Sequence, residues 1–258
     1  MNIAKTIKQQ ALQYLAKDNW ATAIGGFFII CLPAILIVLF QGVALCTMQL
    51  FWDLDNLTMA QNNIILILQL VLVFAFLLTT PMITGYLKLC YNISKGNNAN
   101  LSDVFYYYRN KCFGKCFLLN LKIIVRIILH FLLVMIPALF ALELYFLSHT
   151  QNIQFLILAL LFFSGAVIET VFYSVKYTLI PVIMFEDESL NTKEVFYLGT
   201  TFMKDKLKVT RTLLFTFLPH ILLCFFVVPW IFIFPYITVS FMTNSKWISE
   251  LHKNNTEV

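Results

Sequence analysis

Five long apolar runs dominate the chain, and they constrain its fold more than any other feature of the sequence. They cover Ala21–Leu45, Ile64–Leu87, Phe117–Phe146, Ile153–Phe185 and Thr212–Met242. A helix needs about 20 apolar residues to cross a bilayer, so each run is long enough for at least one span. With 60% hydrophobic and 12% charged residues, the chain does not fit a soluble globular enzyme, a disordered chain or a collagen-like rod. We therefore expect an all-α, polytopic integral membrane protein.

The distribution of Lys and Arg predicts the topology, because positively charged loops stay on the cytoplasmic side. The 18 basic residues lie before the first run, between the second and third, around the loop after the fourth, or near the C-terminus. The connections 47–63 and 148–152 contain none. We expect six spans with both termini inside, the last run forming a hairpin that turns near Val228–Trp230. Five spans with the C-terminus outside is the alternative.

Three segments on the predicted inner side have the periodicity of amphipathic helices. Their apolar faces comprise Ile3, Ile7, Ala11, Tyr14 and Leu15 in the first segment, Leu101, Phe105, Tyr108 and Cys112 in the second, and Val195, Leu198 and Phe202 in the third. The third begins with the spacing of a capping box, Asn191 with Glu194. Apolar faces backed by Lys suit an anionic lipid interface, and equally a face packed on the rest of the protein.

A weak threefold pattern runs through the chain. The second and third amphipathic segments share Val-Phe-Tyr, at Val104–Tyr106 and Val195–Tyr197. Near their inner ends the returning spans carry Pro81, Pro181 and Pro235, each followed two residues later by Ile. The pattern predicts one membrane domain over residues 1–258, with pseudo-repeats at about 1–90, 100–187 and 190–247. Chance similarity between short apolar sequences is the competing explanation.

Several short elements carry a family resemblance: Asn19-Trp20, Pro81 with Gly85, Tyr177 with Pro181, the acidic Glu186-Asp187-Glu188, the helix expected over Asn191–Lys206, and Pro235-Tyr236. In these elements the chain resembles an uncharacterised bacterial multi-pass family, which is related to the membrane domain of some glycerophosphoryl diester phosphodiesterases. The resemblance implies about six spans in the bacterial cytoplasmic membrane. It supplies no catalytic residues, and the phosphodiesterase catalytic domain has no counterpart here. The region Leu144–Ile168 is longer than in that family, and Lys204-Asp205-Lys206 stands where the family tends to have Gly.

The sequence contains no motif of a familiar catalytic or phosphate-binding site. H-E-x-x-H, G-x-S-x-G, S-x-x-K and the P-loop motif are all missing. The four histidines are far apart, without metal-ligand spacing. Gly25-Gly26 lies inside the first apolar run, where it favours close helix packing. We expect no enzyme, no cofactor, no metal site and no nucleic-acid partner.

Polar side chains inside the apolar runs are the remaining indication of function, because charge is costly at bilayer depth. Arg126 and His130 are one turn apart, and Glu169 and Lys176 are two turns apart on the next run. Glu169 is expected to pair with Arg126 or His130 if these helices are antiparallel neighbours. His130 and His220 follow the two Val-Phe-Tyr segments by about the same number of residues. These five residues form either a polar intramembrane site or a structural lock with Lys176 snorkelling.

Three classes of function follow from these features. The first is a non-enzymatic accessory, scaffold or lipid-interacting component, associated with a transport or export system. Its partners would be anionic headgroups at the inner face and another membrane protein or a transporter ATPase. The second is a transporter or permease for ions or small solutes, with a polar site in spans three and four. The third is an intramembrane lipid-modifying enzyme using His130 and Glu169. We favour the first, because no catalytic constellation is visible.

Overall fold

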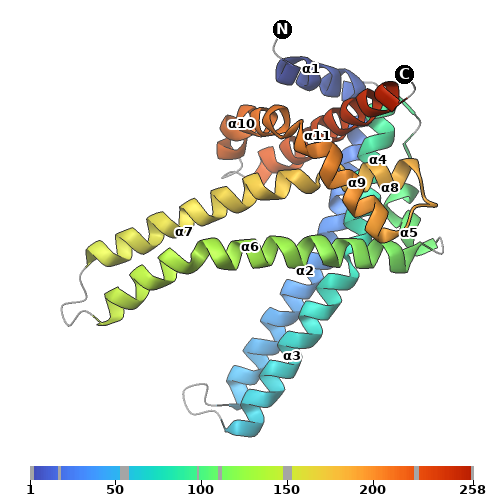
Figure 1. Cartoon of the computed structure of the whole chain (residues 1–258). Helices are drawn as coiled ribbons and strands as arrows, with labels where there is room; N and C mark the ends of the chain where they lie inside the picture. The colour runs from blue at the N-terminus through green and yellow to red at the C-terminus, as the bar shows by residue number, and fades with distance from the viewer. Residues whose placement is uncertain are drawn as a thin grey trace. The chain divides into compact units, whose positions relative to one another are not determined.

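The computed structural model describes residues 3–16, 19–52, 58–97, 99–109, 112–147, 153–223 and 227–256. Every regular element in these segments is helical, so the predicted all-α class is confirmed (Figure 1). Among the described residues, four helical stretches are long and apolar enough to cross a membrane: Asn19–Phe51, Met59–Lys95, Phe113–Leu147 and Ile153–Glu186. They coincide with the first four apolar runs of the sequence.

Contacts within the chain divide the helices into two compact units. The first-hairpin unit comprises Lys5–Phe117 and Phe217–Lys246, and the second-hairpin unit comprises Met1–Ala4, Leu118–Thr216 and Trp247–Val258. In chain order the helices are α1 (Ile3–Ala16), α2 (Asn19–Phe51), α3 (Met59–Leu78), α4 (Thr80–Lys95), η1 (Leu101–Phe105), α5 (Tyr106–Arg109), α6 (Phe113–Leu147), α7 (Ile153–Ser174), η2 (Val175–Tyr177), α8 (Ile180–Glu186), α9 (Thr192–Lys204), α10 (Leu207–Leu223) and α11 (Val227–Thr256). Each unit is described below by itself.

Helix α2 approaches its neighbours closely where its sequence has two glycines. A Cβ at Gly26 would lie 2.9 Å from the Tyr86 ring of α4, and a Cβ at Gly25 would lie 3.1 Å from Leu101 of η1. The predicted role of this glycine pair in helix packing is therefore confirmed. Because glycine lacks a side chain, the backbone of α2 can pack directly on a tyrosine ring.

A proline divides the returning helix of the first-hairpin unit into α3 and α4. Pro81 has no N–H, so it cannot donate to the carbonyl of Leu77 four residues earlier. The Thr80 hydroxyl donates to that carbonyl instead, at 2.8 Å. The neighbouring carbonyl of Leu78 accepts from the Tyr108 hydroxyl of α5. Side chains thus replace the backbone hydrogen bonds that the proline removes, and one of them ties α5 to the break.

The segment η1–α5 buries a different face from the one predicted. Leu101, Phe105 and Tyr108 are 37–42% exposed, whereas Val104 and Tyr107 are fully buried. The cause is the 3₁₀ geometry of η1, which brings residues three apart onto one face, whereas the prediction assumed α-helical spacing. The buried side is therefore formed by Val104 and Tyr107. Of the predicted face, Leu101 lies against Gly25 of α2 and the Tyr108 hydroxyl donates to the Leu78 carbonyl.

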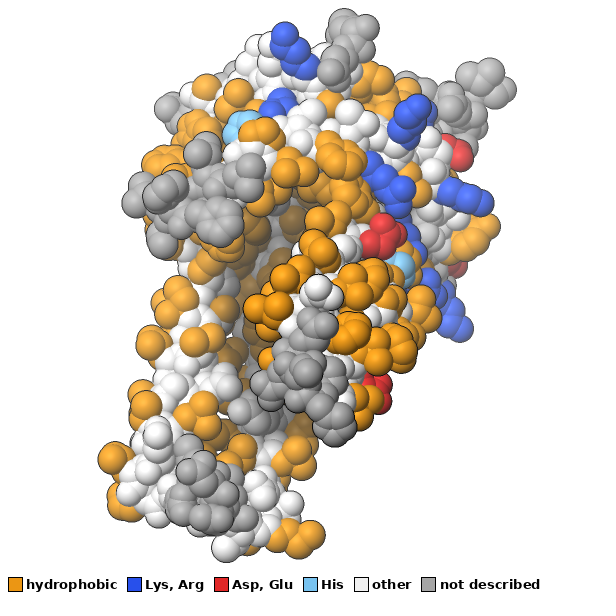
Figure 2. Space-filling model, turned by 90° about the vertical axis from the view of Figure 1, so that its left-hand side faces the viewer, with side chains coloured by type: hydrophobic (Ala, Val, Ile, Leu, Met, Phe, Trp, Pro, Cys, Tyr) orange, Lys and Arg blue, Asp and Glu red, His pale blue; other side chains and the backbone are white. Residues whose placement is uncertain are grey.

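In the second-hairpin unit, α6 and α7 run side by side as an antiparallel pair (Figure 1). In the halves of α6 and α7 nearest the connection between them, the buried residues are small: Ala138 and Ala141 on α6, and Ala159 and Ala166 on α7. Small residues allow helices to approach closely without a hydrophobic driving force. Figure 2 shows hydrophobic side chains on the exposed flanks of the long helices, and no Lys or Arg side chain near the loop end of α2 and α3. Exposed apolar flanks are what lipid-facing helices require.

Helix α9 begins with the predicted capping box. The Asn191 side chain accepts hydrogen bonds from the backbone N–H groups of Lys193 and Glu194, at 2.9 and 3.0 Å. The Glu194 carboxylate accepts in return from the Asn191 N–H, at 2.9 Å. The buried face of α9 comprises Val195, Phe196, Gly199 and Met203. The prediction is therefore confirmed for Val195. Leu198 and Phe202 are only half-buried, because the buried face of α9 is rotated toward Phe196.

The last apolar run forms two helices, α10 and α11, as expected for a hairpin. The turn was expected near Val228–Trp230; these residues belong to the first turn of α11, so the two helices separate a few residues earlier. The chain leaves α10 after Leu223, and residues 224–226 lie outside the described part. Phe217 of α10 and Tyr236 of α11 make an edge-to-face contact, with ring centroids 5.2 Å apart. The choice between six and five spans stays a prediction.

Helix α1 is amphipathic, as predicted from its periodicity. Ile7, Ala11 and Leu15 are 0–3% exposed, whereas Ile3 in the first turn is 42% exposed. The ammonium group of Lys246 lies 5.7 Å from the centroid of the Tyr14 ring, so α1 packs beside α11 in the first-hairpin unit. The protein-packed alternative for this helix is therefore the one the structure supports along most of its length.

Candidate functional site

Three cationic or titratable residues share one face of α6. Lys122, Arg126 and His130 follow one another at four-residue intervals, so their side chains are stacked along the helix. Within the second-hairpin unit this face meets the end of α7 and the start of α9. Tyr173 lies against His130, and Phe196 lies against Lys122 and Arg126.

Phe196 receives two cations on its ring. The Lys122 ammonium is 4.7 Å, and the Arg126 guanidinium carbon 4.3 Å, from the ring centroid. These distances are within the range of cation–π attraction. The Phe196 side chain is 5% exposed, so the ring is held rigidly by its surroundings. It packs against Tyr177, with centroids 5.7 Å apart, and this contact joins the two cations to the end of α7.

Tyr173 lies between a histidine and a lysine. The His130 and Tyr173 rings are parallel, at 5° and 3.7 Å between centroids. The Lys176 ammonium is 3.3 Å from the Tyr173 centroid, which places it over the opposite face of the ring. Tyr177 donates a hydrogen bond to the Tyr173 hydroxyl oxygen at 3.1 Å. The Tyr173 proton is not used in that bond and can donate to another group.

The cluster carries a net positive charge with no carboxylate to balance it. Within the described residues, Lys122, Arg126 and Lys176 form no ion pair, and their close contacts are aromatic rings together with the hydroxyl groups of Tyr173 and Tyr177. Arg126 is exposed, and the two lysines are half-exposed. An aromatic face stabilises a cation but uses few of its N–H donors. We call this group of residues, Lys122, Arg126, His130, Tyr173, Lys176, Tyr177 and Phe196, the cation–aromatic cluster. Its chemistry suits the binding of an anion.

Glu169 is not part of the cation–aromatic cluster. Its side chain is exposed on α7, and within the described residues it forms no ion pair with Arg126 or His130. The reason is the register of the antiparallel helices, in which His130 is level with Tyr173. Glu169 is one turn further from this level, toward the loop end of α7. The predicted pair is therefore absent, and an aromatic stack takes its place.

His220 lies in the other unit, in surroundings of its own. Its ring is 5.7 Å from Phe217 and 6.2 Å from Tyr236, centroid to centroid. Lys8 of α1 places its ammonium 4.5 Å from the Phe217 centroid. Burial lowers the pKa of Lys8. Of the five predicted residues, Arg126, His130 and Lys176 come together within the second-hairpin unit, and Glu169 of the same unit does not join them.

The aromatic members of the cluster were missed from the sequence. Tyr173 and Tyr177 are one helical turn apart near the charged Lys176, which is a usable signal for a shared face. Phe196 belongs to the second Val-Phe-Tyr segment, and the repeat of that segment predicts no contact with a cation. Lys122 is one of the basic residues whose distribution predicts topology and not binding. Cation–π contacts between distant segments have no sequence spacing that would identify them.

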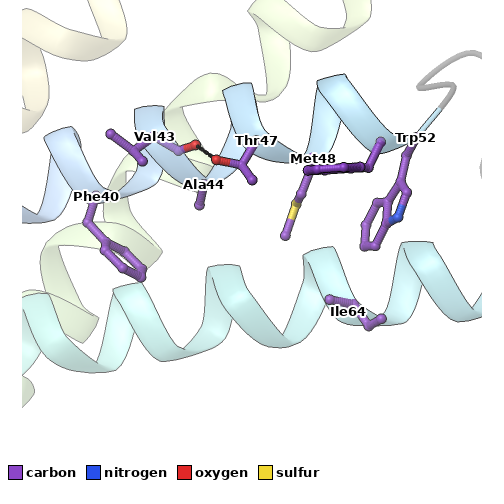
Figure 3. A pocket seen from close by; sticks show the side chains of 8 residues that line it. Phe40, Val43, Ala44, Thr47, Met48, Trp52 and Ile64 are labelled. Carbon is purple, nitrogen blue, oxygen red and sulfur yellow. Dashed lines mark hydrogen bonds between the residues drawn. The ribbon is translucent and has the colours of Figure 1, made fainter.

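A concavity lies between α2 and α3, toward the end of α2 (Figure 3). It has a volume of about 560 Å³ and is lined by Phe40, Val43, Ala44, Thr47, Met48, Phe51, Trp52 and Ile64. The Thr47 hydroxyl already donates to the Val43 carbonyl at 2.8 Å. No lining residue is titratable, so this groove offers hydrocarbon contact and no acid–base chemistry.

Comparison with known proteins finds no matching family model, no similar curated protein and no similar solved structure. The relation to the membrane domain of the phosphodiesterases therefore stays a prediction.

Proposed function

We propose that the protein is a non-enzymatic, multi-pass component of the bacterial cytoplasmic membrane that holds anionic lipid headgroups at its cytoplasmic side. The binding residues are Lys122, Arg126 and Lys176 of the cation–aromatic cluster. One observation carries the proposal: three cations gather on aromatic rings and have no carboxylate partner among the described residues. Cations concentrated without counter-ions favour an external anion, and lipid phosphate is the anion most abundant at a membrane surface.

The depth of the cluster along its helices supports a headgroup ligand. About 20 helical residues cross the hydrocarbon core. Counted from the loop end of α6 at Leu147, 20 residues stop two short of Arg126. Counted from the loop end of α7 at Ile153, they stop immediately before Tyr173. Lys122 and Lys176 lie further on. Long cationic side chains and tyrosine rings are favourable at this boundary, where one end meets hydrocarbon and the other meets water.

The proposal includes the predicted topology of six spans with both termini inside, the threefold repeat, and an accessory role beside a transport or export complex. Two features support the repeat. Helices α4 and α8 both start immediately before a proline, at Pro81 and Pro181. Both Val-Phe-Tyr segments follow an Asn cap, at Asn100 and Asn191. Co-purification of a transport ATPase with the tagged protein would test the accessory role.

The lipid proposal is tested by removing the three cations together. A variant with Lys122→Gln, Arg126→Gln and Lys176→Gln is reconstituted in nanodiscs of mixed zwitterionic and anionic lipid. Native mass spectrometry counts the anionic lipids that stay bound. A basic residue near an anionic surface contributes about 1 kcal/mol to lipid binding. Because the variant lacks three of them, we expect roughly 100-fold weaker retention of anionic lipid. Circular dichroism checks that the variant is folded.

The matched control removes the same charge from exposed positions of the same unit. It carries Lys193→Gln, Lys204→Gln and Arg211→Gln, three side chains exposed on α9 and α10. We expect this variant to retain anionic lipid as the unmodified protein does. Equal losses in the two variants would show that net charge, and not the cation–aromatic cluster, holds the lipid. The proposed site would then be rejected.

A further inference from the structure

We infer that the cation–aromatic cluster selects a phosphomonoester headgroup, as in phosphatidic acid, over the phosphodiester of other anionic phospholipids. This inference rests on the proposed function and names the ligand class of the same site. The two headgroups differ in charge and in the number of terminal oxygens, and the cluster matches the monoester in both respects.

The first match is charge. A phosphomonoester carries about −1.5 to −2 at neutral pH, because its second pKa is near 6. A phosphodiester carries a single negative charge. Lys122, Arg126 and Lys176 supply three positive charges and form no ion pair among the described residues. A ligand with close to two negative charges neutralises this group more fully than a ligand with one.

The second match is the set of hydrogen-bond donors. A phosphomonoester has three terminal oxygens, whereas a diester has two that are not bridging. Arg126 offers a planar pair of N–H donors for two oxygens, and each lysine offers an ammonium. Tyr173 offers its hydroxyl proton, because its oxygen already accepts from Tyr177. Donors from α6 and from the end of α7 are therefore numerous enough to serve all three terminal oxygens of a monoester.

Rigidity of the donors adds to the selectivity. Phe196 is almost fully buried and offers Lys122 and Arg126 a rigid ring to lie against. Tyr173 is held by the His130 stack on one face and carries Lys176 on the other. Side chains that are held in place before binding lose less conformational freedom on binding. We therefore expect the cation–aromatic cluster to distinguish between headgroups better than a flexible patch of lysines would.

The experiment compares the two headgroups at equal surface charge. Nanodiscs of phosphatidylcholine contain either phosphatidic acid or phosphatidylglycerol, adjusted so that the total negative charge is the same. Native mass spectrometry measures the lipid retained by the full-length protein. We expect retention of phosphatidic acid to exceed that of phosphatidylglycerol about tenfold. The Tyr173→Phe variant should lower this ratio several-fold, whereas Tyr197→Phe on the exposed face of α9 should leave it unchanged.

The outcomes separate the inference from the proposed function. Equal retention of the two lipids, with both lost in the triple cation variant, overturns the headgroup preference and leaves the lipid site standing. Retention of neither lipid above phosphatidylcholine overturns both. A third arm adds glycerol 3-phosphate and, separately, inorganic phosphate. If either displaces phosphatidic acid at equal concentration, the phosphomonoester chemistry is supported but its source is a soluble molecule, and the lipid site is rejected.

Discussion

Two stretches of seven residues, Asn100–Tyr106 and Asn191–Tyr197, agree at five positions: the Asn, an acidic residue three positions later, and Val-Phe-Tyr. In both, an asparagine caps the helix, an acid three residues later completes the capping box, and Val-Phe-Tyr follows. Val104 and Val195 are both 0% exposed. The shared pattern is therefore longer than the three residues evident by inspection, and its extra positions are the ones that begin each helix.

The two stretches differ in which aromatic ring meets a cation. In η1–α5, Lys88 lies 3.0 Å from the centroid of Tyr106, the last residue of the pattern. In α9 the cations lie on Phe196, the middle aromatic residue, while Tyr197 is 68% exposed. The 3₁₀ geometry of η1 advances 120° per residue and an α-helix advances 100°, so the rings point in different directions. The shared pattern therefore determines where each helix starts and which valine is buried. Whether the helix is 3₁₀ or α determines which aromatic ring faces a cation.

The helices that carry these two stretches also pack at a glycine, which lies on the partner helix in one case and on the helix itself in the other. In the first-hairpin unit it is Gly85 of α4, whose missing side chain makes room for the backbone of Val104 in η1. In the second-hairpin unit it is Gly199 of α9, which faces Ile180 of α8. Both units therefore contain a close approach between helices at a glycine, but the glycine occupies a different position relative to the shared pattern.

The largest effect is expected from Gly85→Ala. A Cβ at this position would overlap the carbonyl oxygen of Val104, and backbone cannot move aside as a flexible side chain can. Overpacking of this kind costs typically 1–3 kcal/mol, and we expect about 3 kcal/mol or more here. Reversible unfolding in mixed micelles measures the change. Gly42→Ala in α2, where a Cβ would meet nothing within 4 Å, is the control and should be neutral or stabilising.

Gly199→Ala should cost less, about 1–2 kcal/mol, because the nearest atom is part of a side chain. A Cβ there would lie 2.5 Å from Ile180 Cγ1 and 2.9 Å from Ile180 Cα. Adding Ile180→Ala to this variant removes the Cγ1 contact, so we expect the double variant to be less destabilised than the sum of the two single changes. Strict additivity in the same micelle assay would show that the two residues are not in contact.

The smallest effects are expected at the caps. Asn191→Ala should destabilise the protein by about 1 kcal/mol, since two backbone N–H groups lose their acceptor. Asn100→Ala should cost less, because Asp103 of the same capping box is also held by Asn92 at 2.9 Å. Asn→Asp at either position retains the capping oxygen and serves as the control. A larger loss at Asn100 than at Asn191 would contradict the difference expected between the two helix starts.

Features set by local chemistry were predictable from the sequence. The four long apolar helices follow from run length, the α9 cap follows from Asn191 and Glu194, and the close packing of α2 follows from Gly25 and Gly26. Each depends on residues near one another in the chain. None requires knowledge of which distant helix is the neighbour.

Features set by neighbouring helices were not predictable. The face of η1 depends on a 3₁₀ turn that α-helical periodicity does not describe, so Val104 and Tyr107 were overlooked as the buried residues. His130 has a tyrosine as its neighbour and not Glu169, because helix register places Tyr173 at its level. Residue spacing along one helix correctly predicted that Arg126 and His130 lie on the same face of α6. It carried no information on what the next helix would bring to them.

The length of α6 has a consequence for how the protein sits in lipid. The helix has 35 residues, or about 52 Å at a rise of 1.5 Å per residue, against a hydrocarbon core of roughly 30 Å. On the proposed topology, Lys122 and Arg126 lie in the part that exceeds the core. A bilayer thickened by one helical turn, about 5 Å, would draw the Arg126 guanidinium into the hydrocarbon. Headgroup capture would then weaken as acyl chains lengthen, and α6 would act as a ruler for membrane thickness.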